Sequence, residues 1–169
     1  MSERHQVPSS EKSIHEPFMR RAIELSEKAS MIEKSGGVFG AVMVKNGKII
    51  AEGYNQVARH NDPTWHAEME AIREACKKLA DFELKDCELY TTCEPCPMCL
   101  GAIYWARPAR VYFGNTAEDA AKIGFADSLI YKEAARPPSQ RTIPMIPLMR
   151  EQALKAFRVW EEKSDKTPY

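Results

Sequence analysis

Apolar residues recur at helical or strand spacing along most of the chain, and this pattern predicts its secondary structure. The first helix is predicted from apolar residues that recur on one helical face: Phe18, Ala22, Leu25 and Ala29. Two short apolar segments, 41–44 and 49–52, flank Asn46-Gly47, which is a strong signal for a β-hairpin. We therefore expect a helix followed by a pair of adjacent strands.

A second helix is predicted after the turn-forming residues 62–64. Its buried face is expected from residues at helical spacing: Met69, Ile72, Cys76 and Leu79. A strand over 87–92, a short apolar helix over 98–106 and a strand over 110–114 follow, and a last helix is predicted over about 149–163. Strands that alternate with helices indicate a layered α/β domain, in which functional residues gather where strands lead into helices.

Length and charge narrow the class of protein. The chain has 169 residues, the size of one ordinary domain, and its 24 basic and 24 acidic residues give a formal net charge of zero. Proteins that bind nucleic acid usually carry excess positive charge, so nucleic acid is not expected as a partner. The sequence contains no apolar run that could span a membrane, and residues 1–15 lack the apolar segment of a secretion signal. We expect residues 1–15 to form a flexible tail.

The chain has five cysteines, and three of them lie close together at positions 93, 96 and 99. An odd number of cysteines cannot all form disulfides, and this close spacing is typical of metal binding in a reducing compartment. We therefore expect a cytoplasmic protein that has no contact with a membrane.

The cysteine cluster and an upstream histidine suggest a catalytic metal site. Cys96 and Cys99 lie at the start of a predicted helix, at a spacing that directs both thiols to the same side. The helix N-terminus stabilises thiolates, and a pair of thiolates favours zinc. His66 would complete three ligands and leave a fourth position for water, as in catalytic zinc sites. Glu68 could then carry a proton from that water to a leaving group.

Two other interpretations of the metal ligands remain open. Cys93 could join His66, Cys96 and Cys99 in a closed structural site, because its spacing allows four ligands. Alternatively, His60 could replace His66 as the histidine ligand, although its position before a turn favours a loop or surface role.

Several of the same residues also have plain structural interpretations. Free cysteine is among the most buried residue types, and we expect Cys76 and Cys87 to be core residues. Glu68 could simply cap its helix electrostatically. Tyr104 and Trp105 are expected in the core, although one of them could also contact a substrate.

The two motifs together point to a known superfamily. His66-Ala67-Glu68 with Pro95-Cys96-Pro97-Met98-Cys99 matches the signature of zinc nucleobase deaminases. Over about residues 16–114 the chain resembles the cytidine deaminase-like superfamily, which implies a three-layer α/β/α sandwich around a mixed five-stranded sheet, here with a C-terminal arm. Within that superfamily the chain is similar to the bacterial guanine deaminases, on residues that extend beyond these motifs: 39–42, Asn55, 62–63, 93–103, 124–128, 130–133 and Tyr169.

The resemblance implies a reaction and a set of site residues. One zinc ion per chain, held by His66, Cys96 and Cys99 with a bound water or hydroxide, would attack C2 of guanine, release ammonia and leave xanthine. Glu68 and Asp127 would be the catalytic residues, with Asp127 near the 2-amino group. The implied substrate-binding residues are Asn55, which would hydrogen-bond the purine, Phe39 and Trp105, which would pack on the base, Ala67 and Tyr169.

The resemblance also implies an assembly. The implied protein is a homodimer with exchanged C-terminal arms, in which Tyr169 closes the pocket of the partner subunit. We expect the zinc deaminase domain to span residues 16–147, and the C-terminal helix and arm to span residues 148–169.

Three alternative functions remain open on the sequence. A tRNA adenosine deaminase would carry very similar motifs, although the neutral charge and the C-terminal arm weigh against a macromolecular substrate. The enzyme could also act on another small base, a nucleoside or an aminotriazine. The alternative from a different class is a non-catalytic, zinc-stabilised interaction module.

Overall fold

The computed structural model describes residues 8, 11–32, 35–125 and 127–167. The chain divides into two compact units, Met1–Asp127 and Ser128–Tyr169, which are described separately below. This division falls earlier in the chain than the boundary at 147–148 that the sequence suggested.

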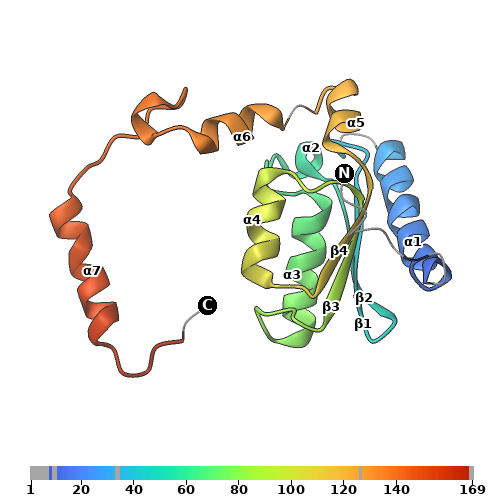
Figure 1. The fold of residues 1–169 in the computed structure, drawn as a ribbon, viewed down its shortest axis with the longest axis horizontal. Coiled ribbons are helices and arrows are strands. Elements are labelled where there is room, and N and C mark those ends of the chain that lie inside the picture. Colours follow the sequence, from blue (N-terminus) through green and yellow to red (C-terminus); the bar gives the residue numbers. More distant parts are fainter. Residues whose placement is uncertain (1–7, 9–10, 33–34, 126, 168–169) are drawn as a thin grey trace. The chain divides into compact units, whose positions relative to one another are not determined.

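The first unit is built on a mixed sheet (Figure 1). The strands lie in the order β2-β1-β3-β4, with bounds Gly40–Lys45 for β1, Lys48–Tyr54 for β2, Cys87–Cys93 for β3 and Arg110–Asn115 for β4. Strand β1 is antiparallel to β2 and β3, whereas β3 and β4 are parallel. The mixed sheet is confirmed. The described residues form four strands in this sheet rather than the expected five.

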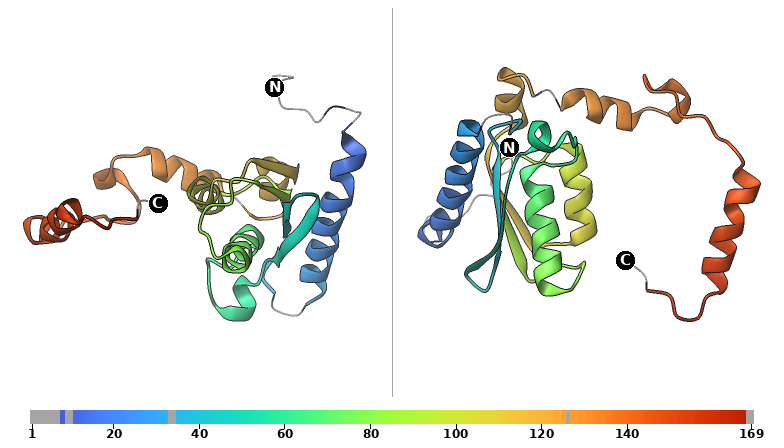
Figure 2. Two further views of the ribbon diagram at one scale, coloured as in Figure 1. Left: turned by 90° about the horizontal axis from the view of Figure 1, so that it is seen from below. Right: turned by 180° about the vertical axis from the view of Figure 1, so that it is seen from behind.

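Helices cover both faces of the sheet, which confirms the three-layer sandwich (Figures 1 and 2). Helix α1, Lys12–Met31, covers one face, and α3, Ala67–Leu79, with α4, Pro97–Ala106, covers the other. Two short helices, α2 at Val57–His60 and α5 at Ala117–Lys122, follow β2 and β4. Residues 12–15, which the sequence analysis assigned to the tail, belong to α1. A contact of 2.7 Å between His15 Nδ1 and the Tyr90 hydroxyl ties this first turn to the sheet.

The hairpin between β1 and β2 is confirmed. Asn46 and Gly47 both have positive φ, 51° and 69°. Two consecutive positive φ angles are what a tight turn between twisted strands requires, and Asn-Gly adopts them with little strain.

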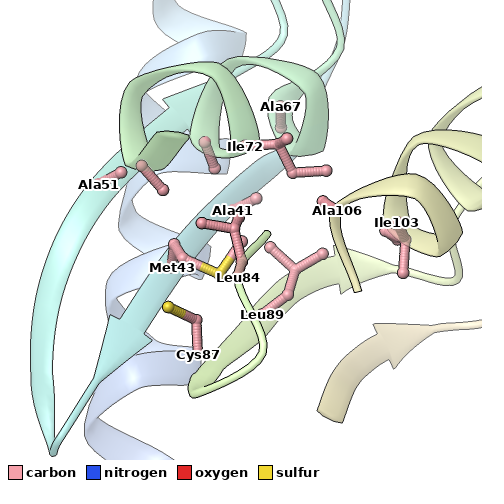
Figure 3. Close-up of a cluster of buried hydrophobic side chains, with 12 residues drawn as sticks. Ala41, Met43, Ala51, Ala67, Ile72, Leu84, Cys87, Leu89, Ile103 and Ala106 are labelled. Carbon is pink, nitrogen blue, oxygen red and sulfur yellow. The ribbon is translucent and has the colours of Figure 1, made fainter. Parts of the chain in front are cut away.

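The main core lies between the sheet and α3 with α4 (Figure 3). Met43 and Leu89 fill it from the sheet, and Leu84 fills it from the loop between α3 and β3. On α3, however, the buried face is made of alanines with Glu68 and Ile72, while Met69, Cys76 and Leu79 are only half-buried. The buried face of α3 is therefore rotated about the helix axis relative to the predicted face. Its buried positions are Ala67, Glu68, Ala71, Ile72 and Ala75.

Small residues face the sheet because α3 lies unusually close to it. A Cβ added at Gly53 in β2 would lie 2.2 Å from the backbone oxygen of Ala67. Real side chains never approach backbone so closely, so glycine is required at this point. The first turn of α3, which follows His66, is thereby held directly on the end of β2.

Two expectations about aromatic residues on α4 are wrong. Tyr104 and Trp105 are 75% and 61% exposed, because they lie on the helix face that points away from the sheet. Ile103 and Ala106 occupy the face that packs into the core instead.

The described residues of the second unit contain two α-helices and one 3₁₀-helix. They are α6, Ser128–Ala135, the 3₁₀-helix η2, Pro138–Gln140, and α7, Arg150–Glu162, which confirms the predicted last helix. None of these elements contains a buried residue. The large apolar side chains of this unit are exposed in the single chain, among them Ile143, Ile146, Leu148, Phe157 and Val159. In the described residues, no helix is both long and apolar enough to cross a membrane.

Candidate functional site

Three potential metal ligands converge at the N-termini of α3 and α4. His66 is the N-cap residue of α3, Cys96 is the N-cap residue of α4, and Cys99 lies in the first turn of α4. Nδ1 of His66 lies 3.5 Å from each of the two sulfur atoms. The three ligand atoms lie within 4.8 Å of one another. The sequence predicts His66, Cys96 and Cys99 as the three metal ligands, and the structure places them in one cluster.

The geometry of this cluster fits a zinc ion. Tetrahedral zinc with Zn–S bonds of about 2.3 Å and Zn–N bonds of about 2.0–2.1 Å requires a sulfur–nitrogen separation of about 3.5 Å. That is the distance from His66 Nδ1 to both Cys96 Sγ and Cys99 Sγ. Two sulfurs and one imidazole nitrogen are also the donor types that zinc prefers, and three protein ligands leave a fourth position open.

The electrostatics of the cluster favour a thiolate at Cys96. A hydrogen bond from Cys99 and the neighbouring His66 lower the pKa of Cys96 to about 4. The same hydrogen bond, together with burial, raises the pKa of the Cys99 thiol, while the contact with Cys96 raises the pKa of His66. The lowered pKa of Cys96 favours its thiolate, the form that binds a metal.

The alternative ligands lie outside this cluster. Among the described residues, the group that could hold a metal contains His66, Cys96 and Cys99 but neither Cys93 nor His60. The Cys93 thiol donates to the backbone oxygen of Thr116 at 3.7 Å. The His60 ring stacks on Trp65, with centroids 4.0 Å apart. The closed four-ligand site is therefore not supported by the arrangement.

Glu68 lies beside the cluster and is only 5% exposed. Its Oε1 accepts a hydrogen bond from the Thr91 hydroxyl at 3.0 Å, and its Oε2 lies 3.5 Å from Cys99 Sγ. Burial raises the pKa of this carboxyl. A carboxyl whose pKa is raised toward neutrality can both accept and release a proton, as general acid–base catalysis requires.

A cavity of about 240 Å³ opens onto these residues. Of the residues predicted from the sequence, six line it: Phe39, Asn55, His66, Glu68, Cys96 and Asp127. Burial raises the pKa of the Asp127 carboxyl. Cys99 is fully buried behind the cavity wall, with none of its surface exposed.

Three predicted substrate-binding residues are not placed in the cavity. Ala67 is buried in the core at the start of α3, and Trp105 lies on the exposed face of α4. Neither is among the residues that line the cavity. Tyr169 lies outside the described residues.

The structure adds cavity residues that sequence reasoning missed. The Phe125 ring meets the Phe39 ring edge to face, with centroids 4.9 Å apart. Glu94 accepts a hydrogen bond from the backbone N–H of Ala117 at 3.0 Å, which fixes the start of α5. Phe125 and Glu94 lay within segments used for the resemblance, but no spacing rule indicated that their side chains reach the cavity. Five further residues complete the lining: Gly36, Val57, Pro63, Cys93 and Ala120.

Asn55 is held in a network that begins on α3. Its backbone N–H donates to the Phe39 oxygen at 3.0 Å. The Glu70 carboxylate accepts the backbone N–H of Tyr54 and the side-chain amide of Gln56, both at 2.9 Å. Because these hydrogen bonds bracket Asn55 on both sides, its backbone is fixed at the cavity wall.

A metal site at two helix N-termini, with a buried carboxyl beside it and a small cavity that opens onto both, fits a zinc-dependent hydrolytic deaminase. Comparison with known proteins supports this class of enzyme. The family model of the cytidine and deoxycytidylate deaminase zinc-binding region matches residues 12–115, and the chain belongs to this family.

Individual relatives extend the similarity beyond this region. The chain is 52% identical to guanine deaminase of Bacillus subtilis (strain 168) over 155 residues, which cover 92% of this chain and 99% of that protein. An X-ray structure of guanine deaminase from Bacillus subtilis superposes with a TM-score of 0.88, covering 92% of this chain and 98% of that one. A tRNA-specific adenosine deaminase of Aquifex aeolicus is 44% identical over 98 residues, but these cover 58% of this chain and 64% of that protein.

Proposed function

We propose that this protein deaminates guanine hydrolytically to xanthine and ammonia, as a step in purine breakdown or salvage. The observation that carries the proposal is the extent of the similarity. Identity of 52% to a guanine deaminase continues over 99% of that protein, whereas the match to the tRNA-specific enzyme covers 64% of it. The chain thus shares with the guanine deaminase a C-terminal part that lies beyond the matched catalytic region.

The dimensions of the cavity support a free base as the substrate. Its volume of about 240 Å³ is below the range of about 300–1,000 Å³ that is usual for small-molecule pockets. A purine base is flat and small, whereas a nucleoside also needs space for its ribose. Phe39 and Phe125 offer aromatic surface to the base, and Asn55 offers an amide that can hydrogen-bond its edge.

In this proposal, the reaction centre combines the metal cluster with two carboxyl groups. Zinc held by His66, Cys96 and Cys99 would lower the pKa of a bound water to about 7, which supplies a nucleophile at neutral pH. Glu68 would take a proton from the water as the water oxygen bonds to C2 of guanine and the C2=N3 π electrons move to N3. Glu68 would then return the proton to the 2-amino nitrogen as the electrons on N3 re-form the C2=N3 bond and the bond from C2 to the amino nitrogen breaks. Asp127, on the cavity wall, would face the departing ammonia.

We further propose a homodimer with exchanged C-terminal arms. Two surfaces support an assembly larger than one chain. The apolar side chains of the second unit, including Ile146 and Leu148, are exposed in the single chain. Exposure of so many apolar side chains to water is unfavourable and is typical of a surface that binds another protein chain. On α4, Gly101 and Tyr104 form part of an outer face on a helix that contains no charged residue. In the exchanged dimer Tyr169 would close the partner's cavity.

The compartment we propose is the cytoplasm. All five cysteines are free, and the two thiols proposed as zinc ligands must stay reduced to bind the metal. An oxidising compartment would put Cys96 and Cys99 at risk of forming a disulfide with each other.

The proposal is tested by a substrate panel. Zinc-loaded protein is incubated with guanine, and the release of ammonia is followed together with the formation of xanthine. Guanosine, cytosine, adenine, an aminotriazine and a tRNA are tested in parallel. Turnover of guanine with little turnover of the others is the expected result. Turnover of another compound in place of guanine would refute the proposed substrate. If nothing is turned over although zinc is bound, a non-catalytic, zinc-stabilised module becomes the better interpretation.

A further inference from the structure

The hydroxyl of Thr91 lies against the carboxylate at the proposed reaction centre. Thr91 Oγ1 and Glu68 Oε1 lie 3.0 Å apart, and Thr91 has no exposed surface. The hydroxyl donates and the carboxylate accepts, and a hydrogen bond to an ionised acceptor is stronger than one between neutral groups. The two residues are distant in the sequence, so the sheet and α3 must be assembled before this contact exists.

The position of Thr91 follows from the alternation of side chains along β3. Cys87 and Leu89 point into the core beneath α3, and Thr91 continues this face toward the N-terminus of the same helix. Valine would fill nearly the same space there and has a high preference for strands. Packing alone therefore does not call for a hydroxyl at this position.

The strand around Thr91 offers this hydroxyl no obvious alternative acceptor. β3 is an inner strand, and Thr91 is paired with Ala41 of β1 on one side and lies in register with Phe113 of β4 on the other. Backbone groups of such a strand are used by the hydrogen bonds of the sheet. The hydrogen bond that the structure gives to the Thr91 hydroxyl goes to Glu68.

This contact gives the two carboxylate oxygens of Glu68 different surroundings. Oε1 is held by the sheet through Thr91, and Oε2 lies 3.5 Å from Cys99 Sγ, on the side of the metal cluster. A group that transfers protons must keep its oxygen within hydrogen-bond reach of the reacting atoms. Rotation of the carboxylate would move Oε2 away from that position.

We propose that Thr91 is a positioning residue, whose hydroxyl holds Glu68 Oε1 so that Oε2 faces the reacting groups. The inference rests on the proposed role of Glu68 as the proton carrier. It does not depend on which base is deaminated. Thr91 itself does not line the cavity and is not expected to touch the substrate.

The kinetic test compares Thr91→Val, which removes the hydroxyl at nearly constant volume, with Thr91→Ser, which keeps it. We expect Thr91→Val to lower kcat about 10- to 100-fold, because misplacement of a reacting group by about 1 Å can cost about 100-fold in rate. KM and zinc content should stay at the wild-type values. Thr91→Ser should recover most of kcat. Wild-type kcat in Thr91→Val, or a loss of kcat in Thr91→Ser as large as in Thr91→Val, would overturn the proposal.

The neighbouring residue provides a matched control. Thr92 is also buried on β3, and its hydroxyl accepts the backbone N–H of Gly40 at 3.1 Å, away from Glu68. Thr92→Val removes an equally buried hydroxyl from the same strand and should leave kcat near the wild-type value. An equal loss of kcat in Thr91→Val and Thr92→Val would indicate general damage to the strand and would overturn the assigned role.

A structural readout decides the question independently of turnover. Crystal structures of the zinc-loaded wild-type, Thr91→Val and Thr91→Ser proteins should show a turned or doubled Glu68 carboxylate in Thr91→Val alone. An unmoved carboxylate in Thr91→Val would overturn the proposal. Thr91→Ala takes the place of Thr91→Val if the latter has a strongly lowered Tm. If the wild-type protein does not use guanine, the proposed substrate fails, but the carboxylate positions still test the role of Thr91.

Discussion

The carboxylate of Glu70 accepts the backbone N–H of Tyr54 at 2.9 Å and so joins the first turns of α3 to the end of β2. The same carboxylate accepts the side-chain amide of Gln56 at 2.9 Å. These hydrogen bonds lie on either side of Asn55, and no part of Glu70 lines the cavity. A residue outside the cavity therefore fixes one of its walls.

Replacement of Glu70 with alanine should weaken substrate recognition. Both hydrogen bonds are lost, the backbone at Asn55 gains freedom, and misplacement of a binding group by about 1 Å can cost about 100-fold in rate. We expect kcat/KM to fall by about 10- to 100-fold, mainly through KM. Steady-state kinetics on guanine measure this. Glu74→Ala, an exposed position one turn along the same helix, is the control and should behave as wild type.

Replacement of Glu68 with glutamine should remove proton transfer but keep the shape of the site. General acid–base groups contribute about 10²–10⁴-fold to rate, so kcat should fall by that range. Zinc content, measured by atomic absorption, should stay at the wild-type level because Glu68 is not among the proposed ligands. Activity close to the wild-type value would show that Glu68 only caps its helix.

Zinc should stabilise the folded protein, in addition to being required for activity. The proposed ligands come from the ends of two helices that are separated in sequence, and binding to the folded form alone raises stability by mass action, by about 4.1 kcal/mol at a free zinc concentration 1,000 times Kd. We expect a chelator to lower Tm and added zinc to restore it. In Cys99→Ala, Tm should no longer respond to zinc. A Tm that is insensitive to chelation in the wild-type protein would argue against the site.

Addition of a methyl group at Gly53 should disturb the start of α3. The new Cβ would lie 2.2 Å from the Ala67 oxygen, and overpacking of this kind costs about 1–3 kcal/mol. Gly53→Ala should therefore lower the free energy of unfolding and weaken zinc binding at His66. Gly101→Ala is the matched control, because its added Cβ would meet nothing within 4 Å apart from its chain neighbours and the backbone of its own helix. In the helix interior this control should gain about 0.5–1 kcal/mol.

The start of α5 should depend on pH through Asp119. Hydrogen bonds from Lys122 and from Thr116 lower the pKa of Asp119 to about 2, below its ordinary value of about 3.9. A lowered folded-state pKa stabilises the fold at pH values above the unfolded-state pKa. That contribution is lost as the pH falls from about 4 toward 2. Urea unfolding of the wild-type protein and Asp119→Asn should differ at neutral pH and converge in this acidic range. A difference that is independent of pH would contradict the assignment.

Local spacing was sufficient to predict the metal cluster and Glu68, whereas the cavity residues Phe39, Asn55 and Asp127 were implied only by the family resemblance. His66, Glu68, Cys96 and Cys99 lie in two short motifs whose geometry is set by a single helix turn each. The hydrogen bond between Thr91 and Glu68 could not be predicted, because it depends on how β3 and α3 pack. The buried face of α3 was misjudged for a related reason. The face was predicted from large apolar residues at helical spacing. The close approach of α3 to Gly53 instead favours small side chains such as alanine on the buried face.

The lining of the cavity comes from two parts of the chain with separate tasks. His66, Glu68 and the cysteines lie within residues 12–115, the part shared with the wider family, whereas Ala120, Phe125 and Asp127 lie after it. Phe39 and Asn55 lie in the shared part, so only one portion of the wall that would contact the base is encoded apart from the proposed zinc ligands and Glu68. Changes after residue 115 could redirect such an enzyme to a different nitrogen heterocycle while its hydrolytic machinery is inherited intact.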